Sequence, residues 1–361
     1  MTPRVSVVVP VYNVERYLPS CLESLIGQTL RDIEIIIVND GSTDGSLSII
    51  KEYASRDDRI VVIDKENGGY GHSMNRGFEK ARGEYIGIVE SDDCARPTMF
   101  QRLYEQGSRH DADVVRSNYF TMSNDGSTFG LIDVLSLSHA PYYTAFNPQD
   151  YPDILRGSPA IWTGIYKRSF LEENNVSFLE TPGASYQDTG FMLKVWGAAN
   201  RAVIMREAFL NYRIDNANSS VKSGAKVFCV CDEYESFEEF LSARPERSEA
   251  FRKMVVAKKY ETYLWNYNRL DNALKPEFLE KMTEEFSEAE EKNALDQSLF
   301  SPVEWNELQA VISNPEALSG KALTVVPPAL DPGEHEKTRY ANGEITFFQL
   351  LAWKIKHALR S

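Results

Sequence analysis

The chain has 361 residues, 42% of them hydrophobic and 25% charged, which is the composition of a soluble globular protein with one large domain or two ordinary ones. Its formal net charge of −14 argues against a nucleic-acid partner held through phosphate contacts, although a metal could still screen the phosphates of a nucleotide. The chain shows neither a signal-peptide pattern nor the run of ~20 apolar residues that crosses a bilayer, so we expect a cytoplasmic protein.

Strands and helices alternate four times at the beginning of the chain. The expected strands are Val5–Val9, Ile33–Val38, Arg59–Asp64 and Glu84–Glu90, and the helices between them are Arg16–Gln28, a segment from Asp44 through Tyr53, and Gly71–Ala81. The first strand is apolar at nearly every position, which is typical of a parallel strand buried on both faces. Short connections between such elements predict right-handed βαβ units and an α/β fold with a parallel sheet.

Three carboxylates in four residues follow the fourth strand, in the stretch Glu90-Ser91-Asp92-Asp93. In an open α/β sheet, ligands bind outside the carboxyl ends of the strands. Hard oxygen ligands suit Mg²⁺ or Mn²⁺, and these ions in turn suit a diphosphate. The alternative is a solvated acidic turn that caps the next helix.

Groups able to bind a nucleotide also follow other strands. Tyr12, after the first strand, could stack on a base, and Asp40, after the second, could accept a hydrogen bond from the N–H of a uracil-like edge. Arg76, on the third helix, could donate to phosphate oxygens. Packing, turn formation and a solvated helix charge are the respective alternatives. Neither a dinucleotide G-x-G-x-x-G fingerprint after the first strand nor a Walker motif is present, which argues against NAD, FAD and ATP hydrolysis.

The motifs Val5–Asn13, Ile36–Asp44, Asn67–Gly69 and Gly83–Asp93 together resemble those of the family 2 glycosyltransferases, inverting enzymes of the GT-A fold. The resemblance implies a nucleotide-diphosphate sugar donor, UDP-linked in our interpretation, and a divalent metal, Mn²⁺ or Mg²⁺. It implies donor contacts from Pro10, Tyr12, Asn13, Asp40, Ser42, Asn67, Arg76, Glu90, Ser91 and Arg213. It makes Asp92 the metal ligand, assisted by Asp93 or Glu90. Family members generally carry aspartate where Glu90 stands, so donor choice or metal geometry stays open.

The middle of the chain is expected to serve the acceptor. Asp113–Phe120 and Ala202–Tyr212 predict strands, and Thr121–Tyr151 predicts a loop-rich region. Ile161–Arg168 resembles the segment that runs through the sheet beside the active site in this family. The polar segment Tyr212–Ser220 resembles a loop that folds over the diphosphate, with an ordinary surface loop as the alternative.

A candidate catalytic base precedes the expected helix Thr189–Ala198. Relatives usually carry Glu-Asp where this chain has Gln187-Asp188. The resemblance therefore implies that Asp188 takes the proton of the acceptor hydroxyl, with a plain helix cap as the alternative. Glu180 is the reserve candidate.

From about Lys222 the pattern becomes helical, with many charged residues on the outer faces. The expected helices are Val227–Leu241, Glu249–Leu270, Pro276–Asn293 and Pro302–Pro315, followed by a loop over Val325–His335. We predict a glycosyltransferase domain over residues 1–222 and a helical C-terminal region over 223–361. The last helix, Ile345–Arg360, mixes apolar and basic side chains. It predicts contact with an anionic membrane surface, packing on the protein's own helices, or self-association.

Together these patterns predict a metal-dependent, inverting glycosyltransferase of the hexosyl- or N-acetylhexosaminyl-transferase class. It would move sugar from a nucleotide donor to a saccharide or lipid-linked glycan in surface polysaccharide synthesis. One alternative is a catalytically impaired nucleotide-sugar-binding protein of the same fold, motivated by Glu90 and Gln187. Another is a sugar nucleotidyltransferase, which would need a glycine-rich basic loop after the first strand. A glycosidase, with two carboxyl groups flanking a bond attacked by water, fits the nucleotide-like strand ends poorly.

Overall fold

The computed structural model describes residues 2–123, 128–134, 139–214, 227–318, 320–325 and 332–358. The chain divides into two compact units, one formed by residues 1–217 together with 330–361 and the other by residues 218–329. The boundary expected at 222/223 lies outside the described residues. The last 32 residues group with the first unit.

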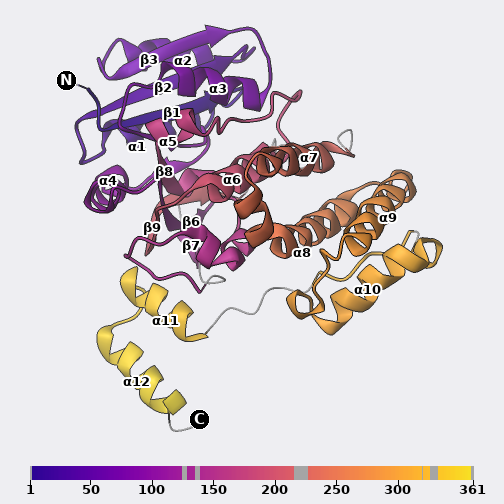
Figure 1. The fold of residues 1–361 in the computed structure, drawn as a ribbon. Helices are drawn as coiled ribbons and strands as arrows, with labels where there is room; N and C mark the ends of the chain where they lie inside the picture. The colour runs from indigo at the N-terminus through magenta and orange to yellow at the C-terminus, as the bar shows by residue number, and fades with distance from the viewer. Residues whose placement is uncertain are drawn as a thin grey trace. The chain divides into compact units, whose positions relative to one another are not determined.

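The first unit is built on a nine-stranded sheet in the order β3-β2-β1-β4-β8-β6-β9-β5, with β7 paired to β6 (Figure 1). The strands are β1 Val5–Val11, β2 Ile33–Asp40, β3 Ile60–Lys65, β4 Tyr85–Ile88, β5 Cys94–Ala95, β6 Val114–Met122, β7 Thr128–Ile132, β8 Gly164–Lys167 and β9 Ala202–Arg213. β1 pairs in parallel with β2 and β4, and β2 with β3, which confirms the predicted parallel sheet. Beyond β4 the sheet is mixed, because β8 runs antiparallel to both β4 and β6.

Helices flank this sheet. They are α1 Leu18–Ile26, α2 Ser46–Ala54, α3 Tyr70–Lys80, α4 Met99–His110, α5 Arg168–Glu173 and α6 Gln187–Ala198, with α11 Pro332–Ala341 and α12 Phe347–Ala358 near the carboxyl end. In α1 the buried side chains Leu18, Leu22 and Leu25 recur at helical spacing, so one face packs on the core. The connection between β8 and the preceding chain includes a short 3₁₀ helix, Ile161–Thr163.

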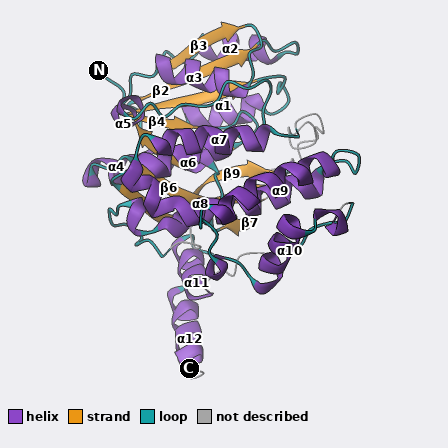
Figure 2. Ribbon diagram, turned by 45° about the vertical axis from the view of Figure 1, so that its right-hand side comes forward, coloured by secondary structure: helices purple, strands orange, loops and turns teal. Residues whose placement is uncertain are grey.

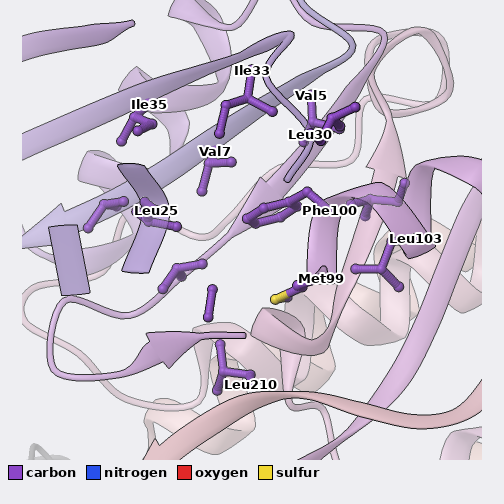
Figure 3. Close-up of a cluster of buried hydrophobic side chains, with 14 of the residues drawn as sticks. Val5, Val7, Leu25, Leu30, Ile33, Ile35, Met99, Phe100, Leu103 and Leu210 are labelled. Atoms are coloured by element: carbon purple, nitrogen blue, oxygen red, sulfur yellow. The ribbon is translucent and has the colours of Figure 1, made fainter. Parts of the chain in front are cut away.

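The core of the first unit lies between β1, β2 and the helices α1 and α4 (Figure 3). Burying each large aliphatic or aromatic side chain of this cluster contributes about 1.5–3 kcal/mol relative to leaving it exposed. Gly87 in β4 allows the closest approach, because a Cβ atom there would lie 2.5 Å from Cε1 of Phe100 on α4. The sequence Tyr85–Ile88 therefore uses its glycine to seat an aromatic ring against the sheet.

The second unit is helical over its described residues. It contains α7 Cys229–Ser242, α8 Pro245–Arg269, α9 Lys275–Glu291 and α10 Pro302–Ser313. Tyr260, Tyr263 and Tyr267 on α8 are fully buried, and the rings of Tyr260 and Tyr263 pack edge-on against Phe286 of α9. Lys259 pairs with Glu285 at 2.6 Å, so the helix pair is also joined by a largely buried ion pair.

Two predictions of irregular structure are wrong in part. The expected loop Val325–His335 ends too late, because α11 begins at Pro332. Proline suits the first turn of a helix, where its missing N–H is not needed, so Pro332 can begin α11. The loop-rich region Thr121–Tyr151 contains β7, a five-residue strand with a central glycine whose pattern is too short to distinguish from a loop. Within the described residues, no helix has the length and apolar character needed to cross a bilayer.

Candidate active site

Three of the predicted nucleotide-binding segments follow strands that end at one edge of the sheet. Because β1 lies between β2 and β4 and is parallel to both, the carboxyl ends of the three strands are adjacent. Tyr12 follows β1, Asp40 ends β2, and the stretch Glu90–Asp93 follows β4. The ring of Tyr12 is 52% exposed, so a base could stack on it.

Asp40 holds the turn that precedes α3. Its Oδ1 accepts a hydrogen bond from the backbone N–H of Gly68 at 2.8 Å, and its Oδ2 accepts one from Gly69 at 3.0 Å. Lys65 forms an ion pair with the same carboxylate, and the amide of Asn67 donates to the Asp40 carbonyl at 3.0 Å. Oδ1 thus already accepts from both Gly68 and Lys65, whereas Oδ2 accepts only from Gly69, so Oδ2 could take an additional N–H from a base.

Gly69 takes a backbone conformation that suits glycine. Its φ of +88° lies in the left-handed region, and a Cβ atom there would lie 2.9 Å from the backbone nitrogen of Gly183. The turn Asn67–Gly69 therefore has a physical need for glycine at its last position. It also lies against the segment that leads to α6.

The loops after β1 and β2 are joined by hydrogen bonds. The N–H of Asn13 donates to Ser42 Oγ at 3.1 Å, and the side-chain oxygen of Asn13 accepts from the N–H of Thr43 at 2.7 Å. Pro10 lies within β1, opposite Val38 of β2, and is buried in the sheet. Of these four predicted contacts, Tyr12 is the exposed one, while Asn13, Ser42 and Pro10 shape the loops around it.

The acidic stretch is crowded and poorly solvated. Burial, with the negative charges of Asp92 and Asp188 added to it, raises the pKa of Glu90 to about 8, although a 2.6 Å hydrogen bond from Tyr70 opposes the shift. Burial and the charge of Asp92 likewise hold the pKa of Asp93 well above its usual range. Ser91 is buried between them, and Asp92 is half-buried.

Arg213, the last residue of β9, lies directly against this stretch. Its backbone N–H donates to Asp93 Oδ1 at 2.8 Å, and its Nε donates to the carbonyl of Asp92 at 2.8 Å. The guanidinium also lies over the ring of Tyr17, 4.7 Å from the centroid. Arg213 therefore braces the backbone of the acidic stretch from a buried position, and supplies positive charge next to three carboxylates.

Asp188 is the second residue of α6. Its negative charge acts on the acidic stretch, because it helps to raise the pKa values of Glu90 and of Tyr70. Burial raises the pKa of Asp188 itself, against hydrogen bonds from Thr189 to its Oδ1. Its neighbour Gln187 is buried and donates to Thr181 Oγ1 at 2.8 Å. The glutamine that replaces the usual family glutamate therefore braces the turn before the helix.

The reserve candidate for the catalytic base, Glu180, contacts the predicted phosphate ligand, Arg76 of α3. Glu180 accepts a hydrogen bond from Asn75 at 2.9 Å and pairs with Arg76 at 3.7 Å. Arg76 also pairs with Glu79 at 2.5 Å. These contacts join Glu180 and Arg76 to each other and to α3, whereas the charge of Asp188 acts on Glu90.

Sequence reasoning missed an aromatic cluster beside the acidic stretch. Trp162 stacks on Tyr212 with a centroid distance of 5.2 Å, and Tyr119 packs edge-on against both rings. Burial and the charges of Asp93 and Asp92 raise the pKa of Tyr212, which places its hydroxyl near these carboxylates. The three rings come from β6, β9 and the 3₁₀ helix before β8, so no local pattern in the sequence joins them.

The acidic stretch offers a donor set that fits a divalent cation only in part. Within the described ranges, no group of three or more His, Cys, Asp or Glu side chains could hold a metal ion by itself. Mg²⁺ and Mn²⁺ are commonly held by one or two carboxylates while phosphates and water complete the shell. Asp93 Oδ2 is buried without a hydrogen-bond partner, and three acidic side chains are crowded together there. These carboxylates fit an ion that takes its other ligands from a bound diphosphate.

Comparisons with known proteins agree with this arrangement. Residues 6–172 match the family model described as glycosyl transferase family 2. The uncharacterized glycosyltransferase EpsJ of Bacillus subtilis is 37% identical over 221 residues, which cover 61% of this chain and 63% of EpsJ. The putative glycosyltransferase EpsH of the same organism is 34% identical over 228 residues, covering 63% of this chain and 65% of EpsH. The chain thus spans less than two thirds of the length of these relatives.

Among solved structures, TarS residues 1–349 from S. aureus has a TM-score of 0.64 at 19% identity, covering 88% of this chain and 90% of that chain. The same TarS fragment in complex with UDP-GlcNAc gives a TM-score of 0.52 at 20% identity, covering 75% of this chain and 82% of that chain. At this identity the likeness shows the fold, which is the GT-A type. The segment over residues 6–172 belongs to the family 2 glycosyltransferases, which confirms the resemblance seen in the sequence.

Proposed function

We propose that the protein is an inverting glycosyltransferase that moves a hexosyl or N-acetylhexosaminyl group from a UDP-linked donor to a saccharide or lipid-linked glycan in surface polysaccharide synthesis. The observation that carries the proposal is the meeting of Glu90–Asp93 and Asp188 at one sheet edge, in a chain whose residues 6–172 belong to this family. The TarS structure with UDP-GlcNAc supports a UDP-sugar as donor.

The donor would lie across the ends of β1, β2 and β4. Tyr12 would stack on the base, and Asp40 would accept a hydrogen bond from its N–H while holding the turn Asn67–Gly69. The diphosphate would then lie near the acidic stretch and Arg213. Asp92, assisted by Asp93, would hold Mg²⁺ or Mn²⁺, and a bound ion would offset the charge that develops on the leaving diphosphate.

Asp188 would act as the general base. Thr189 already donates to its Oδ1, so we assign Oδ2 to the acceptor hydroxyl. As Asp188 takes the proton, the acceptor oxygen forms a bond to the anomeric carbon from the face opposite the diphosphate. The bond from that carbon to the diphosphate oxygen breaks with its electron pair, so the configuration inverts. Burial raises the pKa of Asp188 above its usual range, which makes it a stronger base than an exposed aspartate.

We place this chemistry in the first unit, which contains most of the predicted domain over residues 1–222, and treat α7–α10 as a helical appendage. We also propose that the protein works in the cytoplasm. A nucleotide-sugar-binding protein without turnover is the competing function, because Glu90 and Gln187 depart from the usual family residues.

A thermal-shift screen of nucleotide sugars with Mn²⁺ would identify the donor, since a ligand that prefers the native state raises its apparent stability. The release of UDP from that donor is then measured with and without Mn²⁺. We expect metal-dependent release that is lost in Asp92→Asn. A donor that binds tightly and stays intact over hours, with every acceptor class offered, would favour the binding protein.

A further inference from the structure

Helix α12 follows α11 near the carboxyl end of the chain (Figure 2), and within the described residues one of its faces is apolar and exposed. The exposed fractions are 79% for Phe348, 55% for Phe347 and 41% for Leu351. At about 100° per residue these three positions fall within one arc of roughly 100° on the helix surface. Leu350 lies outside that arc and is buried. One side of α12 is therefore packed, and the side with the two phenylalanines faces solvent.

Helix α12 follows α11, and α11 is held against the sheet of the first unit by an ion pair and hydrogen bonds. Arg206 of β9 pairs with the carboxylate of Glu334 on α11 and donates to its carbonyl at 3.2 Å. Asn342, just after α11, accepts a hydrogen bond from the N–H of Ala208 at 2.6 Å and donates to the carbonyl of Arg206 at 2.7 Å. These contacts tie α11 to the sheet of the first unit. The exposed face of α12 therefore belongs to an attached hairpin and not to a loose tail.

The charge of this segment is opposite to that of the rest of the chain. Residues 345–361 contain two lysines, one arginine and no acidic side chain, whereas the other 344 residues contain 53 acidic and 36 basic side chains. Lys354 and Lys356 on α12 are exposed. An anionic surface would therefore repel most of the protein and attract this segment.

We propose that the α12 face, defined as the apolar Phe347, Phe348 and Leu351 with Lys354 and Lys356 flanking them on either side, docks the protein on the surface of an anionic lipid bilayer. With 12 residues the helix is about 18 Å long, too short to cross the roughly 30 Å hydrocarbon core, so it lies in the interface. The phenylalanines enter the acyl boundary while the lysines contact anionic headgroups. A second copy is a poorer occupant, because a symmetric contact would bring the lysines of the two copies together.

The test is co-sedimentation of the full-length protein with vesicles. Phosphatidylcholine vesicles are compared with vesicles that contain phosphatidylglycerol, at low and at high salt. We expect binding to the anionic vesicles that weakens with salt. Phe348→Ser should weaken it at least about tenfold, from the lost apolar contact. Lys354→Gln with Lys356→Gln should weaken it about 30-fold, from two lost charge contacts with the surface.

Two matched controls test whether vesicle binding depends on the α12 face or on exposed charged and apolar side chains in general. Lys51→Gln with Lys80→Gln removes the same charge from exposed positions on α2 and α3, and Val303→Ser removes an exposed apolar side chain on α10. Both should bind vesicles as the unaltered protein does. The substituted side chains are exposed, so circular dichroism should be unchanged in every variant.

Several results would overturn the proposal. They are equal binding to neutral and anionic vesicles, no binding to either, or a Phe348→Ser variant that binds as tightly as the unaltered protein. A concentration-dependent dimer that Phe348→Ser dissociates would assign the face to a second copy instead. The docking goes beyond the proposed sugar transfer and does not depend on it, so UDP release in solution should be the same in all of these variants.

Discussion

The hydroxyl of Tyr70 donates a 2.6 Å hydrogen bond to Glu90 Oε1, which joins the start of α3 to the acidic stretch after β4. The backbone N–H of Tyr70 also donates to the carbonyl of Gly183, in the segment that leads to α6. One residue thus contacts both the proposed donor site and the support of the proposed base. An aspartate at position 90 would be one methylene shorter and would withdraw its carboxylate from Tyr70, so this contact gives the unusual glutamate a physical role.

We therefore expect Tyr70→Phe to lower kcat/KM for UDP release up to about tenfold, because the hydrogen bond that it removes contributes about 0.5–1.5 kcal/mol. Glu90→Asp should cause a similar loss. The double variant should lose little more than either single variant, since both changes remove the same contact. Losses that multiply in the double variant would show that the two residues act separately.

Asp188→Asn should reduce sugar transfer by about 10²–10⁴-fold, which is the usual contribution of a positioned general base. Donor affinity, measured by calorimetry, should change little, because the proposed donor contacts come from other residues. Glu180→Gln is the matched control, since this carboxylate instead contacts Asn75 and Arg76. If Glu180→Gln lost transfer and Asp188→Asn kept it, the two assignments would have to be exchanged.

Gly87→Ala should destabilise the first unit by about 1–3 kcal/mol, because the added methyl would lie 2.5 Å from the ring of Phe100. Urea unfolding followed by fluorescence measures the change. Phe100→Leu provides the test of cause, since a smaller side chain on α4 should make room for the methyl. The cost of Gly87→Ala should therefore be smaller in a Phe100→Leu background, and an unchanged cost would place the strain elsewhere.

Glu34, buried in β2, accepts hydrogen bonds from Ser6 Oγ at 2.6 Å and from the backbone N–H of Arg82 at 2.8 Å, and it also pairs with the Arg82 guanidinium at 2.7 Å. Burial alone would raise the pKa of Glu34, but these hydrogen bonds outweigh it and the pKa is lowered from its usual 4.5. A lowered folded-state pKa contributes stability that is present above pH 4.5 and is lost as the pH falls through the folded-state value.

Glu34→Gln should thus reduce the free energy of unfolding at pH 7 by about 1–3 kcal/mol, because it weakens these hydrogen bonds. The loss stays within this range because the Arg82 side chain is largely exposed and its charge is screened by solvent. Urea unfolding at pH 7 and at pH 3 checks the sign. The difference between the two proteins should shrink at the lower pH. A difference that grew as the pH fell would contradict the lowered pKa.

The sequence predicted the elements whose patterns are local. The apolar run Val5–Val9 and the similar runs after it predicted the parallel strands. Because Tyr12, Asp40 and Glu90–Asp93 directly follow such strands, their place at one edge of the sheet could also be predicted. The contacts of Tyr70 with Glu90 and of Trp162 with Tyr212 depend on how distant segments pack, and no spacing in the sequence encodes them. The resemblance placed Ile161–Arg168, which contains β8, in the sheet, but the antiparallel pairing of β8 with β4 and β6 was not predicted, because these partners are far away in the chain.

The side-chain amide of Asn342 hydrogen-bonds to the backbone of β9 as a neighbouring strand would. Its oxygen accepts from the N–H of Ala208, and its NH₂ group donates to the carbonyl of Arg206. Where β9 bulges away from the regular ladder with β6, this amide completes the pairing. A chain cut before α11 would leave the N–H of Ala208 without this acceptor, although the Arg206 carbonyl would still accept from Asn118 Nδ2 at 3.1 Å, and an open backbone group invites a strand from another molecule. The segment that contains α11 and Asn342 thus also protects the sheet from pairing with other molecules. We expect aggregation to be the first effect of removing it.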